Sequence, residues 1–336
     1  MTKRVLTGIT TSGTPHLGNY VGAIRPAIEA SRDPNVESYY FLADYHALIK
    51  CQDPARVAQS TLEIAASWLA CGLDSERVFF YRQSDVPEVT ELTWLLTCVT
   101  AKGLLNRAHA YKAAVDANMQ ANEDPDAGVS AGLYMYPVLM AADILAYDTD
   151  YVPVGRDQVQ HVEMAQDMAQ SFNALFGEVF RRPEALMPAE TLAKVPGVDG
   201  EKMSKSYGND IWIFESGKAL QAAIGRIKTD SRPPEEPKDP DGVLLFRFLE
   251  LFLEPAELAG WRERARAGGA GAPGYGHMKK RLVEAVEEHF APARARREAL
   301  LADPSGVDRV LERGAKKARE RAVAVAGRAL EACGLR

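Results

Sequence analysis

The chain has 336 residues, enough for more than one domain around a full hydrophobic core. Hydrophobic residues make up 46% and charged residues 26%, which is typical of a soluble globular protein, and no apolar run approaches the roughly 20 residues that cross a bilayer. The N-terminus lacks the pattern of a secretory signal, so we expect a cytoplasmic protein with no membrane contact. The four cysteines have no metal-ligand or redox spacing, which favours buried free thiols.

The formal net charge is −6, which by itself argues against a nucleic-acid partner. The charge is uneven, however: residues 258–336 carry 17 Lys and Arg against 10 Asp and Glu, whereas residues 1–257 carry a net charge of −13. Such asymmetry indicates a part that faces nucleic acid, but solvated helix faces produce the same pattern. Both interpretations stay open at this level.

The first elements alternate between strand and helix. The segment Arg4–Gly8 predicts a short buried strand, and apolar spacing predicts a helix from Asn19 onward. A second strand is expected over Ser38–Asp44. Asp53 as N-cap and Pro54 at the first helical position predict a helix that stops near Gly72. A third strand is expected over residues 77–83.

The alternation continues through the middle of the chain. We expect a long helical region over Glu88–Leu105, a surface loop over Asp116–Ser130 and a helix over Leu133–Tyr147. A strand over Asp150–Gly155 and an amphipathic helix over Asp157–Gly177 follow. Alternating strands and helices predict an α/β fold with a Rossmann-like, doubly wound parallel sheet.

Strand signals fade after Tyr207. A Pro-rich charged link (Ser231–Gly242) and a glycine-rich loop (Arg266–Gly276) lie in a sequence that is otherwise helical. We therefore expect a nucleotide-fold domain over residues 1–206 and a smaller helical domain over residues 207–336.

Ligands of open parallel sheets bind at the carboxyl ends of the strands. Four polar stretches are expected there: Thr10–Asn19, Asp44–His46, Gly155–Gln158 and Glu201–Asn209. If these stretches meet, they form one site.

The first stretch combines glycines with donors. Gly8, Gly13 and Gly18 allow the backbone to approach a ligand closely. The side chains of Thr10, Thr11, Ser12, His16 and Asn19 supply hydroxyls and donors next to a helix N-terminus, which favours an anion. A plain glycine-rich turn is the alternative.

The fourth stretch, "EKMSKSYGN", places Lys202 and Lys205 beside Ser204 and Ser206. Mobile lysines neutralise phosphate oxygens. An exposed charged loop is the alternative.

Together, "HLGN" (His16–Asn19) and "KMSKS" (Lys202–Ser206) resemble the double signature of class I aminoacyl-tRNA synthetases. The segment Ser130–Asn173 and the stretch "ITTSGTPHLGNYVGAIRP" closely resemble the bacterial tryptophanyl-tRNA synthetases, and weaker matches extend to Leu311–Ala322. The resemblance implies ATP-dependent activation of L-tryptophan to tryptophanyl-adenylate, followed by transfer to tRNA(Trp).

The resemblance implies that Asp143 accepts a hydrogen bond from the indole N–H of tryptophan. Indole only donates, so a carboxylate is a suitable partner, and the apolar neighbours of Asp143 favour a buried carboxylate over a solvated one. Met140 and Val152 would line the apolar part, and Tyr136 and Gln158 would hold the α-amino group. His46 completes the expected tryptophan-binding set.

The resemblance further implies an ATP site and a catalytic set. The ATP residues are Thr10, Thr11, Ser12, Gly18, Asn19, Gly155, Arg156, Asp157, Val195, Lys202, Met203, Ser204, Lys205 and Ser206. Val195 would contact adenine, and Asp157 would bind ribose hydroxyls or serve as an N-cap. His16, Asn19, Lys202 and Lys205 would act on the phosphates. The substrate carboxylate is the nucleophile, and Mg²⁺ is expected to be carried by ATP rather than by a protein metal site.

The sequence departs from the family at two places. Thr10 and Thr11 replace a glutamine and a proline, and Asp116–Gly128 looks like an insertion. The family implies a homodimer, for which Glu88–Leu105 is a reasonable interface. Candidate tRNA contacts in the basic region are Lys279, Lys280 and Arg281, and the last helix could instead dock on the catalytic domain.

Three rival functions share parts of this pattern. A tyrosyl-type synthetase has the same fold and signatures, but "MAADILAY" and "VPVGRDQ" favour tryptophan. A small adenylyltransferase lacks "KMSKS", and a degenerate binding module would not need all the signature residues.

Overall fold

In the computed structural model, which describes residues 2–11, 13–187 and 195–336, five parallel strands form one sheet. They are β1 (Lys3–Ile9), β2 (Val36–Leu42), β3 (Phe79–Arg82), β4 (Tyr151–Pro153) and β5 (Glu184–Leu186), in the order β3-β2-β1-β4-β5. The predicted doubly wound parallel sheet is confirmed. The strand order reverses between β1 and β4, which is where open sheets of this kind bind ligands.

The two central strands are paired along their whole length. The register runs from Lys3 opposite Val36 to Ile9 opposite Leu42, and the last five residues of β2 are buried. Both strands therefore end at the same level. The next residues of each strand, Thr10 and Ala43, begin the loops that surround the cleft.

The helix after β1 starts earlier than its apolar spacing predicts and is irregular. It begins as α1 (Leu17–Asn19), passes through one π-helical turn, η1 (Tyr20–Ile24), and ends as α2 (Arg25–Ala30). Helix α4 (Pro54–Ala70) begins as expected, because Oδ1 of Asp53 accepts hydrogen bonds from the backbone of Ala55 and Arg56.

The helical region expected over 88–105 is confirmed, but it is not one continuous helix. It is divided into α5 (Glu88–Val99) and α6 (Lys102–Leu105), because Thr100 and Ala101 have extended backbone conformations. The surface loop expected from Asp116 is also partly wrong, since α7 (His109–Gln120) includes its first five residues. The remaining residues form the expected loop, which Asn118 holds against the helix. Its Nδ2 donates to the carbonyls of Pro125 and Ala127.

The next helices frame the cleft. Helix α8 (Ala131–Leu145) is capped by Ser130, and the 3-10 turn η3 (Arg156–Gln158) precedes α9 (Val159–Phe176). The helix predicted from Asp157 therefore becomes regular two residues later. At the carboxyl ends of the neighbouring strands, α3 (Asp44–Ala47) follows β2 and the 3-10 turn η2 (Gln83–Asp85) follows β3.

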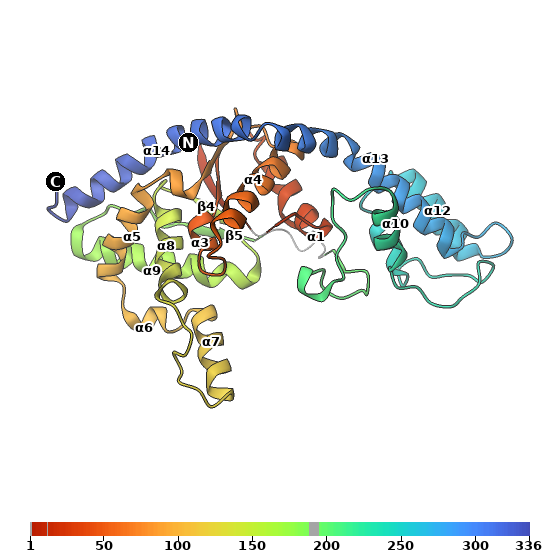
Figure 1. The fold of residues 1–336 in the computed structure, drawn as a ribbon, viewed down its shortest axis with the longest axis horizontal. Coiled ribbons are helices and arrows are strands. Elements are labelled where there is room, and N and C mark those ends of the chain that lie inside the picture. Colours follow the sequence, from red (N-terminus) through yellow and green to blue (C-terminus); the bar gives the residue numbers. More distant parts are fainter. Residues whose placement is uncertain (1, 12, 188–194) are drawn as a thin grey trace.

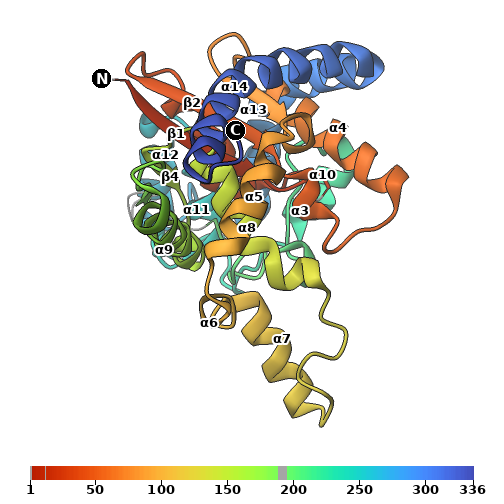
Figure 2. The ribbon, with the colours of Figure 1, turned by 90° about the vertical axis from the view of Figure 1, so that its left-hand side faces the viewer.

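The C-terminal part is helical. After the 3-10 turn η4 (Lys205–Tyr207) come α10 (Gly217–Gly225), α11 (Leu244–Leu249), α12 (Pro255–Ala267), α13 (Tyr275–Ala302) and α14 (Pro304–Ala332). Helices α13 and α14 form a long arch along one side of the molecule, with α10 and α12 under one end, whereas α7 projects away on the opposite side (Figures 1 and 2).

Helix α14 lies against the edge strand β3. Gly314 makes this approach possible, because a Cβ atom there would be 1.9 Å from the carbonyl oxygen of Phe80. Arg319 pairs with both carboxylate oxygens of Glu88, and Asp308 pairs with Arg82. The last helix thus docks on the sheet and covers its edge strand, which would otherwise expose unpaired backbone groups.

Two buried clusters form the core. One joins α1, η1 and α4 to α10, α11 and α13 through residues such as Leu17, Tyr20 and Phe290. The other packs α5, α8, α9 and α14 against the opposite face of the sheet. The C-terminal helices thus share both clusters with the sheet. Within the described ranges, no helix is long and apolar enough to cross a membrane.

Candidate active site

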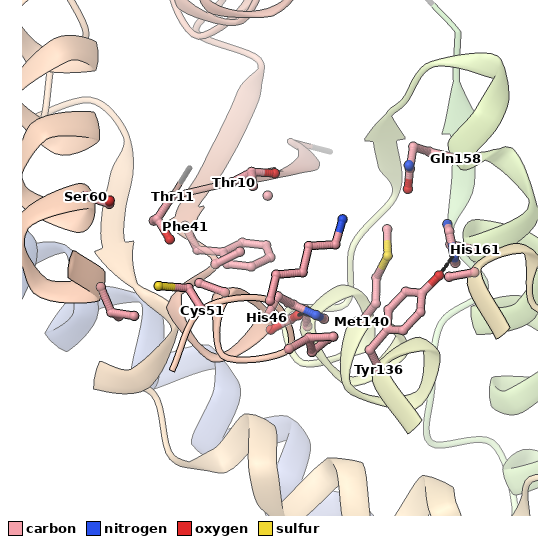
Figure 3. A pocket seen from close by; sticks show the side chains of 18 of the residues that line it. Thr10, Thr11, Phe41, His46, Cys51, Ser60, Tyr136, Met140, Gln158 and His161 are labelled. Carbon is pink, nitrogen blue, oxygen red and sulfur yellow. Dashed lines mark hydrogen bonds and ion pairs between the residues drawn. The ribbon is translucent and has the colours of Figure 1, made fainter. Parts of the chain in front are cut away.

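A cavity of about 1450 Å³ opens at the carboxyl ends of β1, β2 and β4. All four predicted polar stretches contribute, through Thr10 and Thr11, His46, Gly155 and Gln158, and Lys205. Thr10 and Thr11 lie on one side of the opening, and Tyr136, Met140, Gln158 and His161 lie on the other (Figure 3). The expectation that these stretches meet is confirmed.

The six residues predicted to bind tryptophan all line this cavity: His46, Tyr136, Met140, Asp143, Val152 and Gln158. Three of them, Tyr136, Met140 and Asp143, come from one face of α8, because their spacing is close to one and two helical turns. Gly8 makes room for the ring of Phe41 beside them, because a Cβ atom at Gly8 would be 2.9 Å from its Cζ.

Asp143 is a buried carboxylate, 2% exposed, held by two side chains. Its Oδ2 is 3.0 Å from Nε2 of His46, and Nε2 of Gln83 is 2.9 Å from Oδ1 and 2.8 Å from Oδ2. Burial raises the pKa of Asp143, and the hydrogen bonds from His46 and Gln83 oppose that rise. The solvated alternative for Asp143 is therefore excluded.

Tyr136 is oriented by a neighbour on α9. Its hydroxyl is hydrogen-bonded to Nε2 of His161 at 2.6 Å (Figure 3), and burial raises the pKa of Tyr136. Sequence reasoning missed both His161 and Gln83. Each is a polar residue inside a predicted helix or strand end, so only its distant partner reveals its role.

His16 and Asn19 hold each other across the start of α1. Nδ1 of His16 accepts from the backbone N–H of Asn19, and Oδ1 of Asn19 accepts from the backbone N–H of His16. Neither is among the residues that line the cavity, although His16 is close enough to Lys205 for that charge to lower its pKa, after the larger effect of burial.

Two adjacent threonines of the first stretch face the cavity. Thr10 and Thr11 both line it, and Thr11 is 5% exposed. Its hydroxyl has no hydrogen-bond partner within the described part of the chain. Such a buried hydroxyl is available to a ligand. Ser12, predicted beside them, lies outside the described residues.

The two signature loops touch each other. The backbone N–H of Gly18 donates to the sulfur of Met203 at 3.3 Å, and Met203 is buried. Asn209, which sequence reasoning did not single out, shapes the second loop: it accepts from the backbone of Ser204 and donates to the carbonyl of Lys202.

Lys205 alone of its loop lines the cavity, with Nζ 4.9 Å from the centre of the Trp212 ring. Burial lowers the pKa of Lys205, and the nearby Asp210 carboxylate opposes this. Lys202, Met203, Ser204 and Ser206 are not among the lining residues, and the hydroxyls of the two serines are hydrogen-bonded to each other.

Only some of the remaining residues predicted to bind the nucleotide lie at the cavity. Gly155 lines the cavity, and Arg156 begins the turn next to it. The side chain of Asp157 lies outside the described part. Val195 is buried in the core with Leu17 and Met203 and is not among the lining residues.

No group of three or more His, Cys, Asp or Glu residues in the described ranges is arranged to hold a metal ion. Three positively charged side chains of the described residues line the cavity. Lys205 comes from the second signature loop, and Lys50 and Arg56 come from the α3–α4 side.

The comparisons agree with this geometry. The model of the family "tRNA synthetases class I (W and Y)" matches residues 2–291. The tryptophan–tRNA ligase of Pseudomonas aeruginosa is 59% identical over 339 residues, covering 100% of this chain and 75% of that protein. The tryptophan–tRNA ligase of Xanthomonas axonopodis pv. citri is 58% identical and covers 96% of this chain and 73% of that protein.

Solved structures give the same result. A tryptophanyl-tRNA synthetase from Campylobacter jejuni, complexed with ADP and tryptophan, superposes with a TM-score of 0.89 at 43% identity, covering 99% of this chain and 100% of that one. A tyrosyl-tRNA synthetase from Archaeoglobus fulgidus has a TM-score of 0.63 at 17% identity over 88% of this chain and 90% of that one, which shows a common fold.

Proposed function

Because the chain belongs to the class I tRNA synthetases of the W and Y family, we propose a role in that chemistry for each group in its cavity. The activity is that of a tryptophan–tRNA ligase, which activates L-tryptophan with ATP and attaches it to tRNA. The assignments below concern how this chain's own residues carry out those steps.

One observation carries the substrate assignment: a buried carboxylate, Asp143, faces a cavity with apolar walls. An indole ring buries its apolar body against Met140 and Val152 and has a single N–H to satisfy. An unpaired N–H in such a site would cost about 1–3 kcal/mol. Asp143 accepts that N–H, and Tyr136 and Gln158 orient the amino-acid end.

The nucleotide occupies the part of the cavity between the first loop and η3. Thr10, Thr11 and Gly155 border it. Capping uses Nδ1 of His16 and Oδ1 of Asn19, so Nε2 of His16 and Nδ2 of Asn19 are the atoms that we assign to the phosphates. Arg156, the side chain of Asp157 and Ser12 complete the set, and Val195 contributes through the core that supports the second loop.

The reaction itself requires positioning and charge neutralisation, since the tryptophan carboxylate attacks the α-phosphorus and pyrophosphate leaves. Lys205 neutralises the charge that develops on the leaving group. Lys202, Ser204 and Ser206 follow when the second loop closes over the nucleotide. Mg²⁺ enters as part of the nucleotide substrate, bound to triphosphate oxygens, and shares that charge.

The basic C-terminal region is the proposed contact for tRNA. Among the candidates on α13, Lys280 is the most available, since its side chain is 78% exposed, whereas Lys279 donates to the Gly225 carbonyl and Arg281 pairs with Glu257. Such contacts would weaken steeply with salt.

We also propose a homodimer. Trp94 on α5 is 68% exposed, and an exposed tryptophan next to buried leucines is typical of a protein interface. Size measurement in solution tests this, and a monomer that keeps full activity would contradict it. The proposed location is the cytoplasm.

ATP–pyrophosphate exchange with each proteinogenic amino acid tests the proposed function. We expect exchange with tryptophan, and none above background with the others. Exchange with tyrosine would contradict the assignment of Asp143 as the indole acceptor. Exchange with no amino acid would show that the chain is a binding module without synthetase activity.

A further inference from the structure

Gln83 is a fully buried carboxamide that the reaction scheme does not use. It opens the turn η2, directly after β3, and its exposed fraction is 0%. A buried carboxamide that is not needed for packing must be hydrogen-bonded, so its partners indicate its role.

The partners fix which way the carboxamide faces. Its Oε1 accepts the backbone N–H of Tyr45 at 3.1 Å, and its Nε2 is within 2.9 Å of both oxygens of Asp143. A flipped amide would oppose two N–H groups at Tyr45 and place three oxygens together at Asp143. The observed orientation is therefore the only one that satisfies all partners.

His46 completes the arrangement from α3. Its Nε2 lies 3.0 Å from Oδ2 of Asp143. An ionised carboxylate only accepts, so His46 donates from Nε2. A carboxylate has about four lone-pair directions. Gln83 uses one on each oxygen and His46 uses the second on Oδ2, which leaves one on Oδ1.

Further hydrogen bonds connect the turn that carries Gln83 to α3. Asp44 accepts from the backbone N–H of Ser84 at 3.0 Å and from the Ser84 hydroxyl, and it also accepts from the N–H of Tyr45. These contacts join η2 to α3. The element that carries His46 and the element that carries Gln83 are therefore held in one arrangement around Asp143.

We propose that Gln83 is a positioning residue for amino-acid specificity, which orients the Asp143 carboxylate and leaves one acceptor position on Oδ1 for a single substrate N–H. This inference rests on the proposed function of Asp143 as the indole acceptor. Gln83 is not among the residues that line the cavity, so it acts through Asp143.

The test replaces Gln83 by methionine, which keeps the length and removes both hydrogen-bonding groups. The readout is kcat/KM in ATP–pyrophosphate exchange for tryptophan and for an analogue with benzothiophene in place of indole, which keeps the shape and lacks the N–H. Gln59→Met is the matched control, because Gln59 lies on the exposed face of α4, where its side chain donates to Glu63.

We expect Gln83→Met to reduce the preference for tryptophan over the analogue by about tenfold, the value of one hydrogen bond to a charged group, mainly through KM for tryptophan. Gln59→Met should leave the preference unchanged. A purely structural role would lower kcat/KM for both substrates equally, and an unchanged ratio in Gln83→Met would overturn the inference.

The wild-type protein separates the two hypotheses. If it does not prefer tryptophan over the analogue, the assignment of Asp143 fails, and with it the basis of this inference. If it does prefer tryptophan and Gln83→Met keeps that preference, only the role of Gln83 fails. Should Gln83→Met not fold, Gln83→Asn keeps the carboxamide but is one methylene too short to reach Asp143, and the same loss of preference is expected.

Discussion

The backbone N–H of Gly18 donates a hydrogen bond to the sulfur of Met203 at 3.3 Å, although the two residues are 185 positions apart in the sequence. This contact joins the first and second signature loops at their centres. Met203 is buried there, while Lys205, two residues further on, reaches the cavity over the ring of Trp212. The second loop is thus fixed at one residue and presents a cation at another.

Lys205→Ala should lower kcat for ATP–pyrophosphate exchange by about 10²- to 10³-fold, the usual loss when one group that stabilises a transition-state charge is removed. The dissociation constant for tryptophan should change little. The matched variant Lys202→Ala should cost less, because Lys202 is not among the lining residues. Equal losses of kcat and tryptophan affinity in Lys205→Ala would contradict the assigned role.

Asp143→Asn should weaken tryptophan binding by roughly 10- to 100-fold, since one to three kcal/mol is lost when a buried donor loses its charged acceptor. Equilibrium binding by calorimetry measures this directly. Wild-type affinity should also fall as the pH is lowered, beginning above the ordinary range of a carboxyl group, because burial raises the pKa of Asp143. Undiminished affinity in Asp143→Asn would mean that another group selects the indole.

Gly314→Ala should destabilise the protein by more than the 1–3 kcal/mol of a typical overpacking substitution, because the new Cβ would meet the backbone of Phe80, which cannot rotate away. Gly327→Ala, on the same helix with nothing within 4 Å of its Cβ position, should be neutral or stabilise by about 0.5–1 kcal/mol. Thermal unfolding compares the two. Similar melting temperatures would show that α14 does not dock on β3 in solution.

Lys238→Met should loosen the Pro-rich link over residues 231–242. The Lys238 ammonium is 1% exposed and donates to the carbonyls of Pro233, Pro234 and Glu236. Removing it leaves three backbone carbonyls without this donor, and because the residues that carry them are exposed, water replaces part of the loss, which is on the order of 1–3 kcal/mol. Limited proteolysis should then cut the link faster, whereas Lys280→Met, an exposed lysine on α13, should behave as wild type. Equal cleavage rates in Lys238→Met and the wild type would show that Lys238 does not hold the link in place.

The stability should fall as the pH drops below about 6.5, the ordinary pKa of histidine. Burial, followed by the nearby Arg25 charge, lowers the pKa of His289 in the folded state, where its ring is hydrogen-bonded to Tyr20. The unfolded chain then binds the proton more readily, so acid favours unfolding. Urea unfolding at several pH values should show a shallower decline for His289→Gln, with exposed His277→Gln as the control. Identical slopes for all three proteins would refute this.

The strands, most helices and the two signature loops were predictable because each depends on local patterns. Apolar runs followed by polar residues marked the ends of β1 and β2, and Asp53 with Pro54 marked the start of α4. The break at Thr100 was not predictable, since both halves of 88–105 have helical spacing and only packing separates α5 from α6.

For the site, the sequence and its family resemblance indicated Asp143 on α8 and Lys205 in the second loop, and both line the cavity, whereas Lys202 and Val195 do not. Only the tertiary structure decided how they are held: Gln83 and His46 on Asp143, and Met203 on Gly18. It also decided that His16 and Asn19 cap a helix and that α14 rests on β3. The physical reason is that periodicity and capping act over a few residues, whereas these hydrogen bonds and close approaches form only after distant elements have packed.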